Sequence, residues 1–575
     1  MKTFNRLISY LWRYKKSSAI AILFILLSSV TATVIPLMAR YYIDTYIDNG
    51  VWNEGYWLLM VYYSLFLLRV LLTYIGTYAF SYVSNSVVRD LRQEAFTNMQ
   101  KLNMTYFDTT PAGAIVSRLT NDTQAVSDMF SSIFSTFLST LFIVVATLSA
   151  MFSMNVGLTI LMVLFIPVMF ASVKIYNHLS HSVIRKTREK LSEINVKLAE
   201  SIDGMKMIQA FNQEERLRKE FEQINEEHVQ FSNRSINVNS LFLRPAMSLL
   251  KLVAYAVIIL YFGLTWEVAG VTAGVMYAFI QFSNQLFNPL IDVTQNFSII
   301  QTSMIAATRV FEIIDNTDYE PEQLGKVTQI KDGKIEFRNV TFSYDGKRNV
   351  LKNINFVVNP GETVAFVGST GSGKSSIMNL FLRFYDFKEG EILIDELPIQ
   401  HYSKEVLRDK IGLVLQDPFL FHGTVASNIR MYQDITDEDV KQASEFVDAH
   451  HFIEQLPQGY DNKVSEKGST FSSGERQLIA FSRTIAANPK ILILDEATAN
   501  IDSQTEEVIQ TSLKKMRNGR TTLAIAHRLS TIQDANQIFV LDKGEIVESG
   551  THTELLEKEG LYYKMYQLQA GMMQD

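Results

Sequence analysis

Residues 368–375 read GSTGSGKS, and this stretch decides the fold of the second half of the chain. An apolar, strand-like run at 363–367 precedes it, and a helical pattern begins at Lys374. Glycines between a strand and a helix allow successive backbone N–H groups and the positive end of the helix dipole to point at phosphates. Because strand and helix signals flank the stretch, it predicts a nucleotide-binding loop in preference to a flexible Gly/Ser turn.

Within this loop, Lys374 is expected to reach the β- and γ-phosphates of ATP, and the Ser375 hydroxyl is expected to ligate Mg²⁺. The loop residues predicted to bind ATP are Gly368, Ser369, Thr370, Gly371, Ser372, Gly373, Lys374, Ser375 and Ser376.

The composition indicates a membrane protein that also carries a large soluble part. The chain has 575 residues, of which 47% are hydrophobic and 20% are charged, and this length allows several domains. Its formal net charge of -7 argues against a nucleic-acid binder, whose surface would be basic. Because Cys is absent, disulfide frameworks and thiolate metal sites are excluded.

Six apolar stretches each approach the roughly 20 residues that a helix needs to cross a bilayer. They occupy residues 17–39, 56–80, 132–152, 156–176, 246–266 and 271–289. Basic residues precede the first stretch and acids predominate after it, so the positive-inside rule places the N-terminus in the cytoplasm. These charges are Lys2, Arg6, Arg13, Lys15 and Lys16 before it, and Asp44, Asp48 and Glu54 after it.

The segments outside these spans define the expected domain boundaries. Residues 1–16 place Phe4, Leu7 and Trp12 on one helical face, which is typical of an interfacial elbow helix. The long polar segments 81–131 and 177–245 are helix-compatible, so they should extend the membrane helices into the cytoplasm. We therefore expect a membrane domain at 17–314, a polar linker at 315–333 and an α/β nucleotide-binding domain at 334–575.

The run ILILDE at 491–496 has the pattern of a Walker B motif, a buried strand that ends in two carboxylates. Asp495 is expected to hold Mg²⁺ directly or through water, and Glu496 is expected to polarise the attacking water. An acidic pair after a strand is common in proteins, but behind a nucleotide-binding loop it becomes a specific signal.

Together these motifs resemble those of the ATP-binding cassette exporters over nearly the full length of the chain. The further motifs, in family order, are Tyr344, Gln416 in LVLQD, FSSGE at 471–475, Asp502 in TANID and His527 in IAHRL. The resemblance implies that Tyr344 stacks on adenine, that Gln416 senses the γ-phosphate and Mg²⁺, and that His527 contacts the γ-phosphate. It also places Asp502 in the loop that links the two cassettes of a dimer.

The membrane half shows the same resemblance. Residues 106–123 and 200–214 are similar to the first and second coupling-helix regions of bacterial exporters. In that family the second coupling helix reaches the partner's cassette, and six spans with one cassette make a half-transporter. The resemblance therefore implies a dimer.

The signature motif departs from the family pattern, Leu-Ser-Gly-Gly-Gln. The residues here are Phe471, Ser472, Ser473, Gly474 and Glu475. In the family this motif meets the γ-phosphate of ATP bound to the opposite subunit. Ser473 adds a Cβ where glycine allows close approach, and Glu475 places a carboxylate near the phosphates. At an effective dielectric near 20 and about 5 Å, that charge costs roughly 3 kcal/mol per opposing charge before screening.

This departure predicts a heterodimer, because a homodimer would place FSSGE in both sites and leave the intact Lys374, Glu496 and His527 set unused. The expected partner is a second half-transporter with a consensus signature and a replaced Walker B glutamate. The arrangement resembles the asymmetric bacterial multidrug exporters, in which one site hydrolyses ATP and the other mainly holds it.

The resemblance thus implies ATP-driven export of hydrophobic or amphipathic small molecules across the cytoplasmic membrane, with the ATPase domain in the cytoplasm and lipids around the spans. Abundant Phe and Met suit adaptable apolar binding surfaces, although such residues also face lipid or core. A lipid or peptide flippase, a homodimer and a cassette-regulated channel stay open as alternatives. Arg69, within an apolar run, is expected to face the translocation pathway or to pair inside the bundle.

Overall fold

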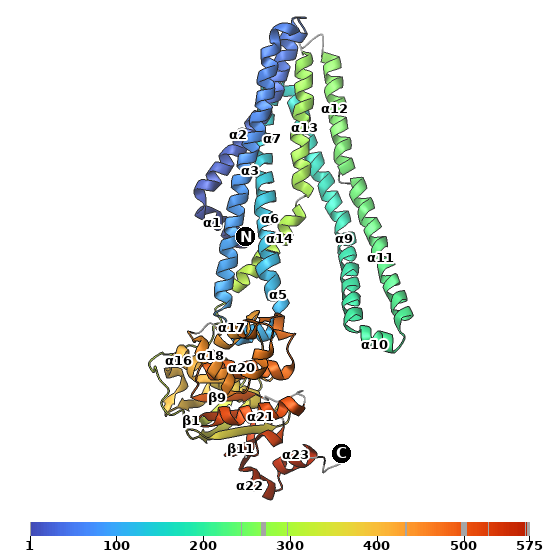
Figure 1. The fold of residues 1–575 in the computed structure, drawn as a ribbon. Helices are drawn as coiled ribbons and strands as arrows, with labels where there is room; N and C mark the ends of the chain where they lie inside the picture. The colour runs from blue at the N-terminus through green and yellow to red at the C-terminus, as the bar shows by residue number, and fades with distance from the viewer. Residues whose placement is uncertain are drawn as a thin grey trace. The chain divides into compact units, whose positions relative to one another are not determined.

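The structure, a computed structural model, describes residues 2–242, 244–265, 272–295, 297–431, 434–495, 503–526, 528–569 and 571. The chain forms two compact units, Met1–Gln100 with Ala112–Asp315, and Lys101–Pro111 with Asn316–Asp575. The first unit is helical, and the second contains the sheets (Figure 1). This confirms the expected fold class, a helical membrane domain followed by an α/β nucleotide-binding domain.

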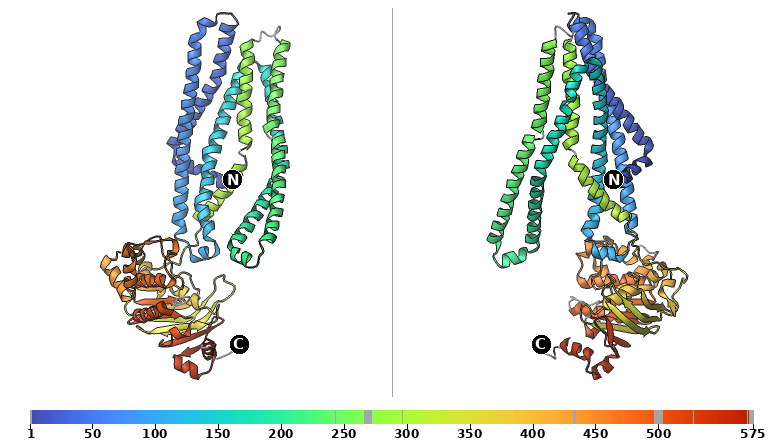
Figure 2. Two further views of the ribbon diagram at one scale, coloured as in Figure 1. Left: turned by 45° about the vertical axis from the view of Figure 1, so that its right-hand side comes forward. Right: turned by 180° about the vertical axis from the view of Figure 1, so that it is seen from behind.

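The helices of the first unit are long and few loops separate them. Their bounds are α1 (Lys2–Arg13), α2 (Lys15–Tyr42), α3 (Tyr56–Met99), α5 (Ala112–Ser117), α6 (Thr123–Asp128), α7 (Ser135–Met154), α8 (Val156–Val163), α9 (Phe165–Asp203), α10 (Met205–Ala210), α11 (Glu214–Phe242), α12 (Arg244–Thr265), α13 (Ala273–Gln295) and α14 (Phe297–Ile314). Figure 2 shows α9 and α11 running side by side, with α10 joining their ends.

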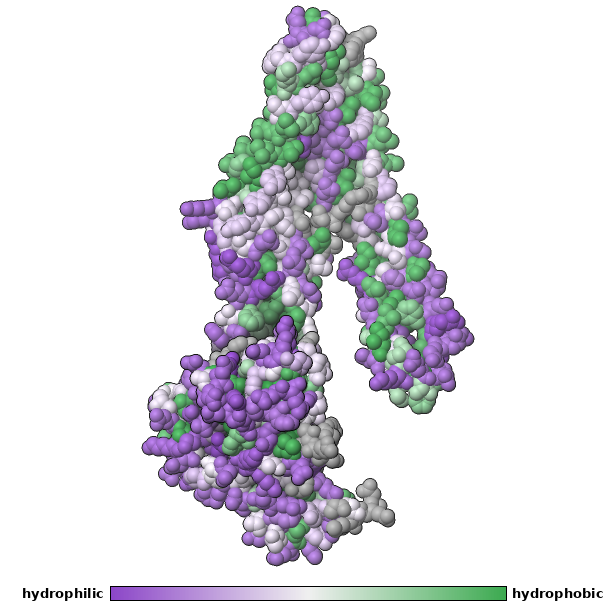
Figure 3. All heavy atoms as spheres, in the orientation of Figure 1, coloured by the Kyte–Doolittle hydropathy of each residue, from purple (hydrophilic) through white to green (hydrophobic). Residues whose placement is uncertain are grey.

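Five helical stretches of the described chain are long and apolar enough to cross a membrane. They are Lys15–Ile47, Trp52–Met99, Ala112–Met154, Val156–Asp203 and Glu214–Leu264. The sixth expected span falls largely on α13, which is less apolar because Gln281, Asn284, Gln285 and Asn288 lie along it. Figure 3 shows hydrophobic side chains over the outer faces of α2 and α3, and a mixture of hydrophobic and hydrophilic ones around α10.

The hydroxyl groups along α2 find partners within the helices. In α2, the hydroxyls of Ser29, Thr31 and Thr33 donate to carbonyls four residues earlier, at 2.9, 2.8 and 3.1 Å. Ser28 instead hydrogen-bonds Thr73 of α3 at 2.7 Å. A hydroxyl satisfied in this way costs little in a bilayer, so these residues do not interrupt the span.

Helix α1 packs one side against protein and exposes the other. Leu7 is fully buried and Tyr10 is 3% exposed against protein, whereas Trp12 is 72% exposed. The Tyr10 hydroxyl and the Arg13 guanidinium both donate to Glu94 of α3, at 2.5 and 2.6 Å. These contacts fix α1 to α3, and its interfacial position stays a prediction.

The second unit is built on two larger sheets and a short two-stranded antiparallel sheet. Its strands are β1 (Ile335–Phe342), β2 (Leu351–Val358), β3 (Thr363–Gly368), β4 (Glu389–Ile394), β5 (Leu397–Pro398), β6 (Ile411–Val414), β7 (Gly423–Thr424), β8 (Lys463–Val464), β9 (Ile491–Asp495), β10 (Thr521–Ile525), β11 (Gln537–Asp542) and β12 (Glu545–Gly550). Its helices are α4 (Met104–Thr109), α15 (Lys374–Phe381), α16 (Lys404–Lys410), α17 (Val425–Arg430), α18 (Asp437–Phe446), α19 (His450–Gln455), α20 (Ser473–Ala486), α21 (Ser503–Arg517), α22 (His552–Glu557) and α23 (Leu561–Gln569).

The central sheet has the order β12-β11-β3-β10-β9-β6, and β11, β3, β10, β9 and β6 are parallel. Alternate residues of β3 belong to different hydrophobic clusters, Val364 and Phe366 to one and Ala365 and Val367 to the other. Because side chains alternate across a strand, both faces of this sheet are covered. An antiparallel sheet, β2-β1-β4-β5, packs beside it.

Candidate nucleotide-binding site

The loop between β3 and α15 requires glycine at defined positions. Gly371 and Gly373 have φ of 82° and 108°, in the left-handed region that side chains rarely adopt. A Cβ at Gly373 would lie 2.7 Å from Leu351 Cδ2 and 3.2 Å from the Val350 carbonyl oxygen. The loop therefore keeps its backbone close to β2, and α15 begins at Lys374 with its free N–H groups directed out of the sheet.

Lys374 is held against this loop. The Lys374 residue is 5% exposed, and its ammonium group donates to the carbonyl oxygens of Gly368 and Ser369 at 2.7 and 2.9 Å. The buried Ser372 hydroxyl has no hydrogen-bond partner in the described chain. A helix N-terminus, a buried cation and an unpaired hydroxyl together fit the phosphate groups of a nucleotide.

Tyr344 is connected to the loop through its hydroxyl, which donates to Ser376 Oγ at 3.1 Å. Its ring meets those of Phe342 and Tyr385 edge-on, with centroids 4.7 and 4.8 Å apart. Tyr344 is nevertheless 42% exposed, so one side of the ring is open for stacking on a base.

The remaining predicted residues gather at the carboxyl edge of the parallel strands. Asp495 is the last residue of β9, Gln416 follows β6 by two residues, and β10 lies between β9 and β3. Ser375 and Gln416 are exposed, and Asp495 is half-buried. Carboxylate, hydroxyl and amide oxygens are suitable Mg²⁺ ligands. Three predicted residues, Glu496, Asp502 and His527, lie outside the described residues.

The signature segment forms a capped helix start. Ser472 Oγ accepts from the Glu475 backbone N–H at 3.2 Å, and the Ser472 backbone N–H donates to Glu475 Oε2 at 2.7 Å. This reciprocal capping box stabilises α20, and Phe471 beside it is buried. The Glu475 carboxylate therefore lies at the positive end of the helix dipole, where it offsets the attraction for another anion.

Arg483 joins α20 to the segment that follows Gln416. Its guanidinium donates to the Asn428 and Phe419 carbonyl oxygens at 2.8 and 3.0 Å and to Asn428 Oδ1 at 3.2 Å. Burial lowers the pKa of Arg483 to about 10. The signature helix and the Gln416 segment are thus held together by hydrogen bonds.

Replacing Arg483 with Met should therefore destabilise the nucleotide-binding domain. The substitution keeps much of the volume but leaves buried oxygens without donors, a loss of about 1–3 kcal/mol. The midpoint temperature of thermal unfolding, measured on the detergent-purified protein, should fall by about 2–4 °C for each kcal/mol of stability lost. Arg408→Met, at an exposed position of α16, is the control, and equal midpoints for both variants would contradict the assigned role.

Tyr385 and Asp108 form a contact that the sequence did not reveal. The Tyr385 hydroxyl donates to Asp108 Oδ2 of α4, and burial, with Asp108 adding to it, raises the pKa of Tyr385. Since the Tyr385 ring also touches Tyr344, one side chain connects the predicted first coupling region to the expected adenine site. The aromatic run RFYDF at 383–387 was the only available signal.

Tyr385→Phe should weaken this connection while keeping the ring. Loss of a hydrogen bond to a carboxylate removes about 1.5–3 kcal/mol, whereas the contact with Tyr344 remains. We expect ATP affinity within about twofold of the original, a change below 0.5 kcal/mol, and a reduced stimulation of ATPase activity by transported compounds. Asp108→Asn should act similarly; undiminished stimulation in both variants would contradict the connection.

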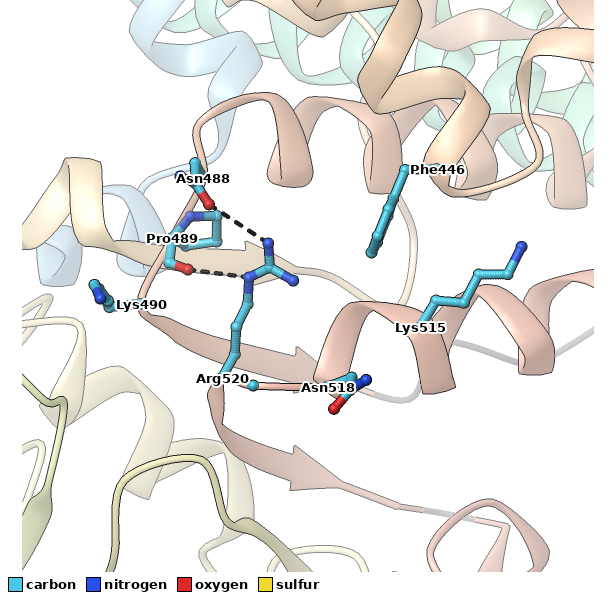
Figure 4. A pocket seen from close by; sticks show the side chains of 8 residues that line it. Phe446, Asn488, Pro489, Lys490, Lys515, Asn518 and Arg520 are labelled. Atoms are coloured by element: carbon cyan, nitrogen blue, oxygen red, sulfur yellow. Dashed lines mark hydrogen bonds between the residues drawn. The ribbon is translucent and has the colours of Figure 1, made fainter.

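A second hollow, of about 470 Å³, lies at the other edge of the same sheet (Figure 4). Arg520 precedes β10 and donates to Pro489 O at 3.1 Å and Asn488 Oδ1 at 3.5 Å. Lys515 pairs with Asp448 at 2.6 Å. Because the hollow lies at the amino ends of β9 and β10, it is separate from the loop at 368–375.

A helical membrane domain and a phosphate-binding α/β domain in one chain define a nucleotide-binding membrane protein. The family model described as ABC transporter transmembrane region matches residues 18–290, and the model described as ABC transporter matches residues 351–499. The exp8 protein of Streptococcus pneumoniae, named as an ABC transporter ATP-binding protein, is 57% identical over 99% of this chain and 98% of that protein.

This chain therefore belongs to the ABC transporter family, as a half-transporter with one ATPase domain that is homologous to multidrug ABC exporters. YheH of Bacillus subtilis, assigned by its name to the multidrug resistance ABC transporters, is 43% identical over 89% of this chain and 77% of that protein. The ATP-dependent lipid A-core flippase of Syntrophus aciditrophicus is 33% identical over 99% of this chain and 95% of that protein.

The structure of a bacterial Atm1-family ABC exporter with ATP bound matches with a TM-score of 0.79 at 28% identity, covering 97% of this chain and 98% of that chain. The chain is accordingly a multi-pass membrane protein and an ATP-binding, ATP-hydrolysing transporter.

Proposed function

We propose that this chain is one half of an exporter that uses ATP hydrolysis to move amphipathic compounds, of the multidrug type, out across the cytoplasmic membrane. The observation that carries the proposal is the union in one chain of a phosphate-binding loop and a membrane domain that together match a solved exporter over 97% of the chain. The Bacillus subtilis relative named for multidrug resistance supports the substrate class.

In this proposal Tyr344 stacks on adenine and the loop 368–376 encloses the phosphates with Lys374. The oxygens of Ser375, Asp495 and Gln416 hold Mg²⁺, which when bound neutralises charge on the phosphates. Glu496 then orients and polarises the attacking water, and His527 contacts the γ-phosphate. The shared sheet edge of β3, β9 and β6 supports this grouping.

Residues 106–123 and 200–214 act as the coupling regions, and closure of two cassettes moves them. The Tyr385 contact with Asp108 supports the first assignment, and the short helix α10 lies within the second. Residues 1–16 serve as the elbow helix and 315–333 as the linker. In this proposal the N-terminus and the ATPase domain lie in the cytoplasm, which the basic residues before the first span support through the positive-inside rule.

The signature geometry supports a heterodimeric transporter with one degenerate ATP site. Glu475 caps α20 with its carboxylate, so the helix end that should meet the partner's ATP already carries a negative charge. We infer that Asp502 contributes to the loop between the two cassettes. The partner supplies a consensus signature for the site of Lys374, Glu496 and His527, and has lost its own Walker B glutamate.

A lipid flippase is the second candidate, because the relative from Syntrophus is named for that activity. The two functions differ in the molecule moved, and one preparation can separate them. Inside-out vesicles would contain this chain and a candidate partner half-transporter with a consensus signature. They would be given a fluorescent soluble amphiphile or a fluorescent phospholipid.

Export predicts ATP-dependent uptake of the soluble amphiphile, abolished by Lys374→Ala, with the phospholipid left in its leaflet. ATP-dependent movement of the phospholipid alone would support the flippase. Movement of neither compound, with intact ATP binding, would contradict the proposed class of substrate.

A further inference from the structure

A cavity of about 310 Å³ lies inside the membrane domain, between α3 and α13 with contributions from α2 and α7. This volume is at the lower end of the about 300–1,000 Å³ range of small-molecule sites. Tyr62, Phe66 and Arg69 line it from α3, at the spacing that places three residues on one helical face. The cavity therefore combines an aromatic wall with a single cation.

The opposite wall is a polar stripe on α13. Tyr277, Gln281, Asn284 and Asn288 recur at intervals of three or four residues and all line the cavity. This stripe is also the reason that α13 is less apolar than the other spans. Figure 3 shows hydrophilic side chains on the part of the bundle where α13 runs.

Several of these polar groups are engaged within the protein. Gln281 donates to the Tyr277 hydroxyl at 3.3 Å, and Gln285 donates to the Ala32 carbonyl oxygen at 2.7 Å. Asn284 accepts from Tyr255 at 2.5 Å. By contrast, the Asn288 side chain, which is exposed, makes no hydrogen bond to any described residue. It is thus available to a bound molecule.

Arg69 determines which charge a molecule bound in this cavity would carry. In the part of the chain that the structure describes, no carboxylate lies within ion-pair distance of its guanidinium, and no side chain accepts a hydrogen bond from it. A charge at the centre of a membrane helix costs about 2.5–3.5 kcal/mol on insertion scales and is normally paired or functional. The described residues that line the cavity with Arg69 are all neutral, so this wall offers no counter-charge and an anionic group of a bound molecule would fit beside the guanidinium.

We propose that this cavity binds the anionic head group of an amphipathic substrate, such as a carboxylate or phosphate monoester. Arg69 pairs with the anion through its planar fork of N–H donors, and Asn288 and Tyr62 add polar contacts. Phe66, Ile35 and Ile143 contact the first apolar atoms of the substrate. This inference rests on the proposed function and narrows its substrate class to organic anions with a hydrophobic tail.

The test compares two probes that differ only in charge: dansylaminoundecanoic acid and its carboxamide. Binding is followed by fluorescence on the full-length transporter, with its partner subunit, in phosphatidylcholine nanodiscs without ATP. Because hydrogen bonds to a charged group contribute about 1.5–3 kcal/mol, the acid should bind at least about tenfold more tightly than the carboxamide. Equal binding of the two probes by the unmodified protein would overturn the proposal.

Variants then assign the selectivity to the cavity. Arg69→Gln should lose at least about tenfold in affinity for the acid and leave carboxamide binding within about twofold, while Arg69→Lys should keep most of the selectivity. Tyr63→Phe, at an exposed position of the same helix, is the control. If Arg69→Gln does not fold, Asn288→Leu provides the test, because it should weaken the acid more than the carboxamide. Unchanged selectivity in the variants would refute the assigned site.

Two further measurements distinguish a lipid occupant from a soluble one, and the head-group inference from the proposed function. Competition by phosphatidylglycerol added to the nanodiscs would identify an anionic lipid as the natural occupant, and absence of competition would identify a soluble amphiphile; either supports the head-group site. ATP-driven export that does not distinguish the probes would refute this inference and leave the proposed function intact. Charge-selective binding without transport of either probe would support the head-group site and contradict the proposed export function.

Discussion

The transporter carrying Glu496→Gln should bind ATP normally and hydrolyse it about 10²–10⁴ times more slowly, the range for loss of a general base. The substitution replaces a carboxylate by an amide of the same shape that cannot accept a proton at neutral pH. Lys374, Ser375 and Asp495 remain, so nucleotide contacts should persist. ATP binding and steady-state hydrolysis, measured on the same preparation with its partner subunit, provide the comparison.

Two controls define this result. Lys374→Ala should lose ATP binding as well as hydrolysis, because its buried ammonium lies on the loop that receives the phosphates. Glu557→Gln, at an exposed site of α22, should change neither quantity. Near-normal turnover in Glu496→Gln would remove this residue from the catalytic role.

The second large effect concerns the signature. Expressed without a partner, the chain should hydrolyse ATP slowly, because every site would be completed by FSSGE. Ser473→Gly combined with Glu475→Gln should raise this activity about tenfold or more, since even a screened part of a roughly 3 kcal/mol repulsion corresponds to that factor. Gln at this position can still form the capping box with Ser472, so the helix start should survive.

The measurement is ATPase activity of the purified single chain, compared with that of the chain co-purified with a candidate partner half-transporter that has a consensus signature. Glu475→Gln alone should give part of the gain, and Glu557→Gln none. Fast, substrate-stimulated hydrolysis by a homodimer of the original chain would contradict the degenerate site and with it the heterodimer.

The parallel sheet could be predicted because its strands are continuous apolar runs that end in motif residues, as at Asp495 and Gly368. The antiparallel strand β2 mixes exposed and buried residues, and β4 has three exposed residues followed by three buried ones, so neither is a continuous apolar run that gives a comparable signal. The motif residues themselves were identifiable by spacing. Their mutual placement needed the strand order, which puts β10 between β3 and β9.

Glu475 was interpreted only as an added charge, although Ser472 with an acid three residues later is also a local capping pattern; the structure shows that Glu475 caps α20. Other features of the site depended on tertiary structure. The Tyr385 contact with Asp108 joins residues 277 positions apart, and no local periodicity can indicate such a pair. The same is true of the cavity beside Arg69, which needs α3 and α13 together.

The discontinuity of the second unit has a consequence for biosynthesis. Lys101–Pro111 belongs to that unit through the Leu102 bridge to Tyr319 and the hydrogen bond from Asn103 N–H to Asp318 O at 2.8 Å. A ribosome adding about 5–20 residues per second needs roughly 20–90 s to proceed from this segment to residue 575. During that interval the segment waits beside an inserted membrane domain without the strands it will join, so the nascent chain should be most open to proteases and chaperones there.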